Sequence, residues 1–160
     1  MKITFIGTGY VGLVSGVLFA DLGNDVICVD TNKDKIVNLK KGVIPIFEPG
    51  LEEILKKNLK SKRITFTTDL SKAVMASKII FIAVGTPTAK DGVSADLKNV
   101  FKVTKQIATN VNNYKIIINK STVPVGTGDE VEKIISKRVK KNNFDIVSNP
   151  EFLREGEAIR

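Results

Sequence analysis

A glycine-rich turn near the N-terminus constrains the fold of this chain more than any other feature. It has the pattern G-x-G-x-x-G at residues 7–12 and separates an apolar run at 3–6 from a helix-like stretch at 10–22. In this context the first glycine permits a tight turn, the second lets backbone approach a pyrophosphate, and the third lets the helix pack closely on the strand. The N-terminus of the helix then offers free N–H groups to phosphates. The predicted cofactor-binding residues of this turn are Gly7, Gly9, Tyr10, Val11 and Gly12.

Short apolar runs alternate with amphipathic stretches along the rest of the chain. We expect strands at 3–6, 26–29, 64–67, 79–84, 115–119 and 144–148. We expect helices at about 10–22, 33–41, 51–59, 69–76, 96–111 and 126–141. Strands separated mainly by helices predict an α/β fold with a doubly wound parallel sheet, the three-layer α/β/α Rossmann fold, with strand order 3-2-1-4-5-6. A length of 160 residues fits one such domain, spanning 1–160.

Asp30 ends the second expected strand. It follows the glycine turn by about the interval at which an acidic residue accepts hydrogen bonds from the adenosine ribose hydroxyls. Its charge would repel a 2′-phosphate, and Thr31 rather than an arginine comes next, so NAD is favoured over NADP. Lys33 and Lys35 lie close to Asp30 in the sequence, and their positive charges oppose its effect. The preference for NAD therefore needs a test. The alternative interpretation of Asp30 is a helix-capping or surface acid.

Composition excludes several kinds of site. The chain has no histidine, which removes the commonest general base and the commonest metal ligand, and we expect no metal site. The single cysteine, Cys28, cannot pair within the chain, so a reducing, cytoplasmic compartment is expected. The formal charge of +8 comes from lysines scattered mostly at expected helix ends, and we expect no nucleic-acid partner. No apolar stretch predicts a membrane span, so no membrane partner is expected.

Three loops with distinctive residues follow the last three expected strands. They are Gly-Thr-Pro at 85–87, Ser-Thr-Val-Pro at 121–124 and Asn-Pro-Glu at 149–151. In a parallel sheet these loops share one edge with the glycine turn, the edge at which ligands bind. A helix that begins at Pro150 would place Glu151 and Glu155 one turn apart. Turn chemistry explains any one of these loops, but together they predict an NAD-binding domain with a carboxylate-bearing site at the rim.

Five segments together resemble the N-terminal domain of the UDP-glucose dehydrogenase family. They are GTGYVGLVSG (7–16), IPIFEPGLE (44–52), VGTP (84–87), NKSTVPVGTG (119–128) and SNPEFLREG (148–156). The resemblance implies oxidation of the sugar C6 alcohol to a carboxylate, UDP-glucose to UDP-glucuronate, with two hydrides passed to two NAD. Relatives that act on GDP-mannose or UDP-N-acetylmannosamine share much of this pattern. The segment at 119–128 favours UDP-glucose as the substrate over these two sugar nucleotides.

The resemblance also implies a role for individual residues. The implied NAD contacts, with their neighbours in the rim loops, are Val11, Asp30, Lys35, Gly85, Thr86, Pro87, Ser121 and Thr122, with Glu155 near the nicotinamide. Thr122 is implied to help hold a catalytic water, and Glu151 to act in acid–base and water-activating steps. The implied sugar-nucleotide contacts are Glu151, Phe152, Leu153, Arg154 and Glu155.

One part of the family's site has no counterpart in these residues. Family members form a thiohemiacetal and a thioester on a cysteine that lies well beyond residue 160, where a lysine, an asparagine and an aspartate complete the site. The resemblance therefore implies that these residues are the N-terminal part of a longer, homodimeric enzyme. This part is expected to be inactive by itself. The alternative is a stand-alone NAD-binding module whose short length is natural.

Overall fold

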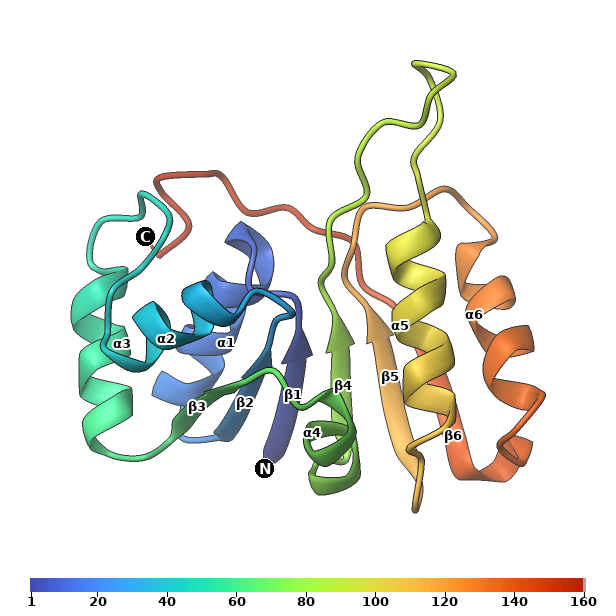
Figure 1. Ribbon diagram of the computed structural model, residues 1–160, viewed down its shortest axis with the longest axis horizontal. Coiled ribbons are helices and arrows are strands. Elements are labelled where there is room, and N and C mark those ends of the chain that lie inside the picture. The colour runs from blue at the N-terminus through green and yellow to red at the C-terminus, as the bar shows by residue number, and fades with distance from the viewer. Residues whose placement is uncertain (160) are drawn as a thin grey trace.

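The computed structural model describes residues 1–159 and shows a parallel sheet flanked by helices (Figure 1). The strands are β1 (Lys2–Ile6), β2 (Asp25–Val29), β3 (Ile64–Thr67), β4 (Ile79–Ile82), β5 (Lys115–Asn119) and β6 (Phe144–Ser148). The helices are α1 (Tyr10–Asp21), α2 (Lys33–Lys40), α3 (Leu51–Lys60), α4 (Leu70–Ala76), α5 (Lys98–Ala108) and α6 (Thr127–Ser136), with a short 3₁₀ helix at Lys141–Asn143. All neighbouring strands pair in parallel in the order β3-β2-β1-β4-β5-β6, which confirms the predicted doubly wound sheet.

The two faces of the sheet carry separate hydrophobic cores. Strand side chains alternate between faces, so that Phe5 and Phe81 point toward α1 whereas Ile80 and Ile82 point toward α5. The register pairs Phe5 with Phe81, and their rings stack with centroids 4.4 Å apart. Cys28 of β2 lies fully buried in the first of these cores. Burial on both faces explains why the strands are almost continuously apolar in the sequence.

Several element boundaries differ from the sequence expectation. The helix expected at 96–111 is α5, which begins at Lys98 and ends at Ala108. The helix expected at 126–141 is α6, which ends at Ser136, because the chain turns so that Val139 enters the core and β6 can begin at Phe144. The strand expected at 79–84 ends at Ile82, whose carbonyl accepts the amides of Lys120 and Ser121 from the neighbouring loop. The amide of Ala83 still donates to the carbonyl of Ile6 at 2.8 Å, and residues 83–85 line the candidate site.

The helix expected to begin at Pro150 is absent from the described residues, and that prediction was wrong. Residues 149–154 have no regular secondary structure, and a turn follows. The amides of Gly156 and Ala158 donate to the side chains of Tyr10 and Glu48, so they are not available for helical bonds to carbonyls four residues back. Tertiary hydrogen bonds therefore override the local preference. Arg160 lies outside the described residues.

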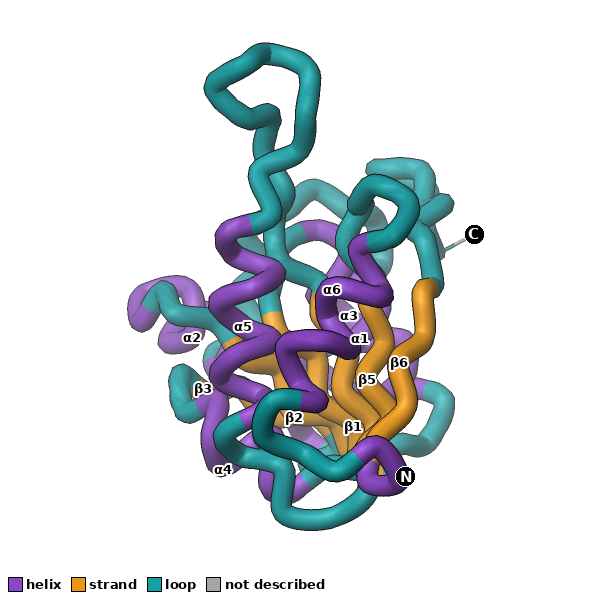
Figure 2. The backbone as a smooth tube through the Cα atoms, turned by 90° about the vertical axis from the view of Figure 1, so that its right-hand side faces the viewer, coloured by secondary structure: helices purple, strands orange, loops and turns teal. Residues whose placement is uncertain are grey.

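The carboxyl ends of the strands meet along the upper edge of the sheet in Figure 1, where the loops after β1, β4, β5 and β6 converge. The loop between β4 and α5 projects well above this edge as a small hairpin, closed by an antiparallel bridge between Thr88 and Ala95 (Figure 2). Residues 149–159 cross the same edge from β6 to the connection between α2 and α3. Among residues 1–159, no helix is both long enough and apolar enough to cross a membrane.

Candidate NAD and carboxylate site

The glycine turn has the close backbone approaches that its sequence predicts. Gly7 has φ +102°, and a Cβ there would lie 2.4 Å from the carbonyl oxygen of Ala83. A Cβ at Gly12 would lie 2.0 Å from the carbonyl oxygen of Gly7. The third glycine therefore lets α1 pack on the turn itself, rather than on the strand as the motif led us to expect. Any other residue at these two positions would open the turn.

Gly9 is different, because a Cβ at this position would meet no atom within 4 Å. It lies immediately before α1, where backbone N–H groups of the first helical turn have no intrahelical partner. Two cavities share Gly9 and residues 83–85 as walls: one of about 370 Å³ on the β2 side and one of about 180 Å³ on the β5 side. The open space in front of Gly9 is where a pyrophosphate bridging two nucleoside halves would fit.

The β2-side cavity is lined by Asp30 and Lys35 together with the turn. One carboxylate oxygen of Asp30 accepts the amide (3.0 Å) and the hydroxyl (2.6 Å) of Thr8, and Lys35 Nζ lies 3.3 Å from it. The other oxygen accepts the amide of Asn32 at 3.0 Å. Burial raises the pKa of Asp30, but hydrogen bonds from Thr8 and Asn32 and the charge of Lys35 outweigh it and hold the pKa below its usual value. Asp30 thus faces the cavity as a carboxylate and also braces the glycine turn.

The β5-side cavity is bounded by the loops after β4 and β5, which are joined by hydrogen bonds. Thr86 Oγ1 donates to the carbonyl of Thr122 at 2.8 Å, and Ser121 Oγ donates to the carbonyl of Val84 at 2.8 Å. The cavity walls include Tyr10, Val11, Gly85, Thr86, Ser121 and Thr122. Of the predicted cofactor residues, Gly12, Pro87 and Glu155 line neither cavity. The carbonyl of Pro87 accepts the amide of Asp96 at the base of the projecting hairpin.

Glu151 is held at this rim by a lysine that the sequence analysis did not single out. Lys120 Nζ lies 3.1 Å from Glu151 Oε2, and their side chains are only 14% and 11% exposed. Lys120 also lines the β5-side cavity, so it connects Glu151 to the same space as Thr122. The other oxygen of Glu151 accepts the amide of Leu153. The signal was present in the sequence, since Lys120 directly precedes Ser121 in a segment already noted.

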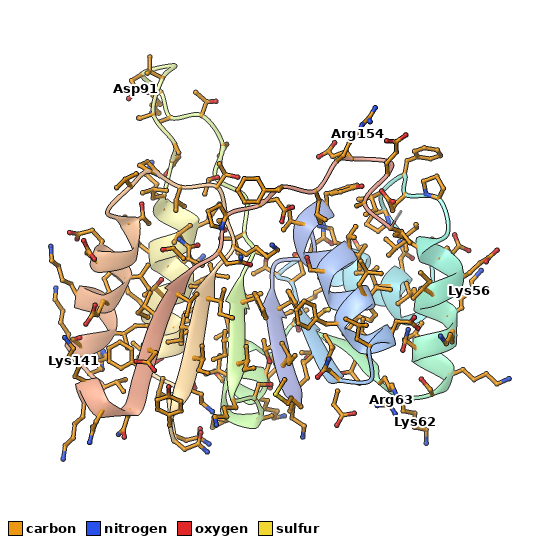
Figure 3. All side chains as sticks on the ribbon, turned by 180° about the vertical axis from the view of Figure 1, so that it is seen from behind. Lys56, Lys62, Arg63, Asp91, Lys141 and Arg154 are labelled. Atoms are coloured by element: carbon orange, nitrogen blue, oxygen red, sulfur yellow. The ribbon has the colours of Figure 1, made fainter. Side chains whose placement is uncertain are left out.

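The remaining residues of the predicted sugar-nucleotide segment lie at the surface. Phe152 is 89% exposed, and Glu155 is exposed. Arg154 pairs with Glu157 at 2.8 Å and points away from the molecule at its upper edge (Figure 3). Leu153 is partly buried against the α1-side core. The structure therefore brings Glu151 to Lys120, which lines the β5-side cavity, while Phe152, Arg154 and Glu155 are exposed.

A comparison with protein families agrees with this arrangement. The profile of the UDP-glucose/GDP-mannose dehydrogenase family, NAD binding domain, matches residues 1–160. The chain belongs to this family. The resemblance seen in the sequence is confirmed, and NAD is the cofactor of the domain.

Individual relatives of this family member are similar over nearly all of its sequence. It is 57% identical to a UDP-glucose 6-dehydrogenase from Rhizobium meliloti and to UDP-glucose 6-dehydrogenase TuaD from Bacillus subtilis, over 99% of this chain but only 36% and 34% of theirs. Its fold matches a UDP-glucose dehydrogenase from Pyrobaculum islandicum (40% identity, TM-score 0.93) and a GDP-mannose dehydrogenase from Pseudomonas aeruginosa (37%, 0.95). Each match covers 99% of this chain and 37% or 38% of the solved one. The chain thus spans about a third of the length of these proteins.

Proposed function

We propose that residues 1–160 are the N-terminal NAD-binding domain of a UDP-glucose 6-dehydrogenase, which oxidises UDP-glucose to UDP-glucuronate with two NAD. One observation carries the proposal. Two adjoining cavities, together called the groove below, share Gly9 and residues 83–85; Asp30 lines one of them, and Lys120, which pairs with Glu151, lines the other. Such a groove matches a dinucleotide whose adenosine lies toward β2 and whose nicotinamide lies toward β5, next to a carboxylate.

In this proposal each side chain has one task. Asp30 accepts the adenosine ribose hydroxyls, and Lys35 lies beside them. Thr86 and Thr122 bound the nicotinamide half, where NAD supplies the hydride acceptor. Thr122 and Glu151 hold the water that the acid-forming step requires, and Glu151 takes its proton. Lys120 lines the cavity beside Thr122 and holds the Glu151 carboxylate at 3.1 Å.

The surface segment supplies the proposed sugar-nucleotide contacts. Residues 149–159 cross the upper edge of the sheet (Figure 1), and the exposed Phe152, Arg154 and Glu155 present an aromatic ring, a cation and a carboxylate. Glu155 is placed nearest the nicotinamide. A further part of the protein would close over this segment, contribute the nucleophilic cysteine and form the homodimer. We place the enzyme in the cytoplasm because its one cysteine in these residues is a buried thiol.

The choice of UDP-glucose rests on sequence rather than on fold. The solved UDP-glucose and GDP-mannose dehydrogenases superpose about equally well, at TM-scores of 0.93 and 0.95. Solved UDP-N-acetylmannosamine dehydrogenases, such as Cap5O from Staphylococcus aureus, are less similar, at 32% identity. Identity of 57% to two UDP-glucose 6-dehydrogenases favours UDP-glucose.

The test is an assay of the complete reading frame that encodes this chain. The purified product is given NAD with UDP-glucose, GDP-mannose or UDP-N-acetylmannosamine, and NADH is followed by absorbance. We expect two NADH per UDP-glucose consumed and much slower turnover of the other two. Preferred turnover of either of the other two would reassign the substrate. A frame that ends at Arg160 and binds NAD without turnover would support the stand-alone module instead.

A further inference from the structure

Tyr10 joins the glycine turn to the segment that carries Glu151 and Glu155. Its hydroxyl donates to a carboxylate oxygen of Glu48 and accepts the amide of Gly156 at 2.8 Å. Tyr10 is the first residue of α1, directly after Gly9, and it lines the β5-side cavity. One side chain therefore touches the candidate pyrophosphate turn, the nicotinamide-side cavity and the chain that crosses above both.

Glu48 is the second half of this connection. It lies between α2 and α3 and is only 4% exposed. Its Oε1 accepts the amides of Ala158 at 2.9 Å and Ile159 at 3.3 Å, while its Oε2 accepts the Tyr10 hydroxyl. Within the described residues, the donors to this carboxylate are N–H and O–H groups. Figure 1 shows the crossing segment passing over α1 to end beside the α2–α3 connection.

The arrangement is more specific than packing requires. Leu153, Ala158 and Ile159 already attach the segment to the α1-side core by apolar contacts. A buried carboxylate is costly unless it is hydrogen-bonded, and the three donors to Glu48 offset that cost while fixing the direction of the segment. Directional hydrogen bonds that include the glycine turn can make the position of residues 151–159 depend on whether a dinucleotide is bound at that turn.

We propose that Tyr10 and Glu48 are positioning residues that couple NAD binding at the glycine turn to docking of residues 151–159 over the groove. This inference rests on the proposed NAD site. A dinucleotide seated on the turn fixes Gly9 and the start of α1, and hence the Tyr10 hydroxyl that holds Gly156. Because such coupling is reciprocal, a docked segment also favours the turn that binds NAD.

The protonation states suit this role at neutral pH. Burial, and then the hydrogen bond to Glu48, raise the pKa of Tyr10, so its hydroxyl keeps the proton that it donates. The same hydrogen bond is the main cause that holds the pKa of Glu48 below its usual value, so the carboxylate stays an acceptor.

The test is hydrogen–deuterium exchange of the 160-residue chain, resolved at the amides of Gly156, Ala158 and Ile159, with and without saturating NAD. We expect NAD to slow exchange at all three amides at least three-fold. In Tyr10→Phe, Gly156 should exchange at least ten-fold faster, and the slowing by NAD should disappear at all three. In Glu48→Ala, the amides of Ala158 and Ile159 should exchange faster than in the unmutated chain.

Glu48→Gln and Tyr114→Phe sharpen the test. The glutamine keeps an acceptor oxygen, so it should restore much of the protection that Glu48→Ala loses. Tyr114 also donates to a carboxylate, that of Asp145, but it lies just before β5 at the opposite edge of the sheet. Tyr114→Phe removes the same kind of bond and should leave exchange at Gly156, and the NAD effect, unchanged.

The outcomes separate two failures. If the unmutated chain does not bind NAD by calorimetry, the proposed cofactor site fails. If it binds NAD and the three amides do not respond, or if Tyr10→Phe responds like the unmutated chain, the coupling is refuted while the site stands. A Tyr10→Phe chain that also exchanges faster at Ile80 in β4 has lost global stability, and the comparison of Glu48→Ala with Glu48→Gln then decides.

Discussion

The amide and the hydroxyl of Thr8 donate to the same oxygen of Asp30, at 3.0 and 2.6 Å. The acid at the end of β2 therefore braces the glycine turn of β1 and also faces the cavity where ribose hydroxyls would lie. Because it has two tasks, its removal does not measure ribose recognition alone. Variants at both residues are needed to separate the tasks.

We expect Asp30→Ala to weaken NAD binding by about ten- to a hundred-fold, since hydrogen bonds to a charged group contribute about 1.5–3 kcal/mol. It should also remove the discrimination against NADP. Thr8→Ala removes only the hydroxyl, so it should weaken NAD less and keep the discrimination. Titration calorimetry with both cofactors checks this. Equal affinity for NAD and NADP in the unmutated chain would show that Lys35 overrides the acid.

The contribution of Asp30 to stability should depend on pH. Burial raises the pKa of Asp30, but the hydrogen bonds and the charge of Lys35 lower it by more than burial raises it. Its folded-state pKa therefore lies below the unfolded value of about 3.9. A lowered carboxyl pKa gives stability that is present above the unfolded pKa and lost as pH falls through the folded pKa. Urea unfolding should show the unmutated chain more stable than Asp30→Asn at pH 7. A stability difference that persists undiminished at pH 3 would contradict this.

Alanine at Gly9 should weaken NAD binding and leave stability nearly unchanged, whereas alanine at Gly12 should reduce stability. Gly9 has φ −68°, and a methyl group added there would meet no atom within 4 Å, so Gly9→Ala should leave the melting temperature nearly unchanged. It should nevertheless weaken NAD binding at least ten-fold, because the methyl occupies the space of the pyrophosphate. Gly12→Ala meets the Gly7 carbonyl and should destabilise the fold by about 1–3 kcal/mol. Thermal unfolding and NAD titration of both variants test the contrast; a stable Gly12→Ala chain would refute the steric argument.

Breaking the Lys120–Glu151 pair should reduce the stability of the fold. Both side chains are nearly buried, and removing one partner of a buried pair costs about 3–5 kcal/mol because the other charge is left unpaired. We expect Lys120→Met to approach this loss in urea unfolding, and the double variant Lys120→Met/Glu151→Gln to recover part of it. Lys120→Arg is the matched control that keeps the charge. No recovery in the double variant would mean that the pair is not coupled.

The 160-residue chain should bind NAD but not form NADH from UDP-glucose. Cys28 is its one thiol, fully buried in β2, and burial raises the pKa of this thiol to about 12. It should react with a thiol reagent only after unfolding, and it cannot serve as the nucleophile of the rim. Steady NADH formation by purified chain, persisting in Cys28→Ala, would show that the chemistry needs no further segment.

Local patterns determined the parts of this protein whose requirements are local. Apolar runs with helix-like stretches between them predicted the sheet order, and the spacing of three glycines predicted the turn, because backbone sterics act within a few residues. Asp30 was predicted at the cavity from its place after β2, although its bond to Thr8 was not. The helix predicted to begin at Pro150 was the main error. Proline favours the first position of a helix, but the local sequence does not reveal that Tyr10 and Glu48 accept the amides of Gly156 and Ala158.

Only the tertiary structure decided which distant side chains meet above the groove. Lys120 pairs with Glu151 because β5 and β6 are neighbours whose loops leave the sheet at the same edge. Tyr10 and Glu48 meet although they are 38 positions apart in the sequence, because α3 packs against α1 and brings the α2–α3 connection to the start of α1. Neither contact leaves a periodic signal along the chain. A hydrogen bond depends on positions in space, which the sequence specifies only through the packing of the whole sheet.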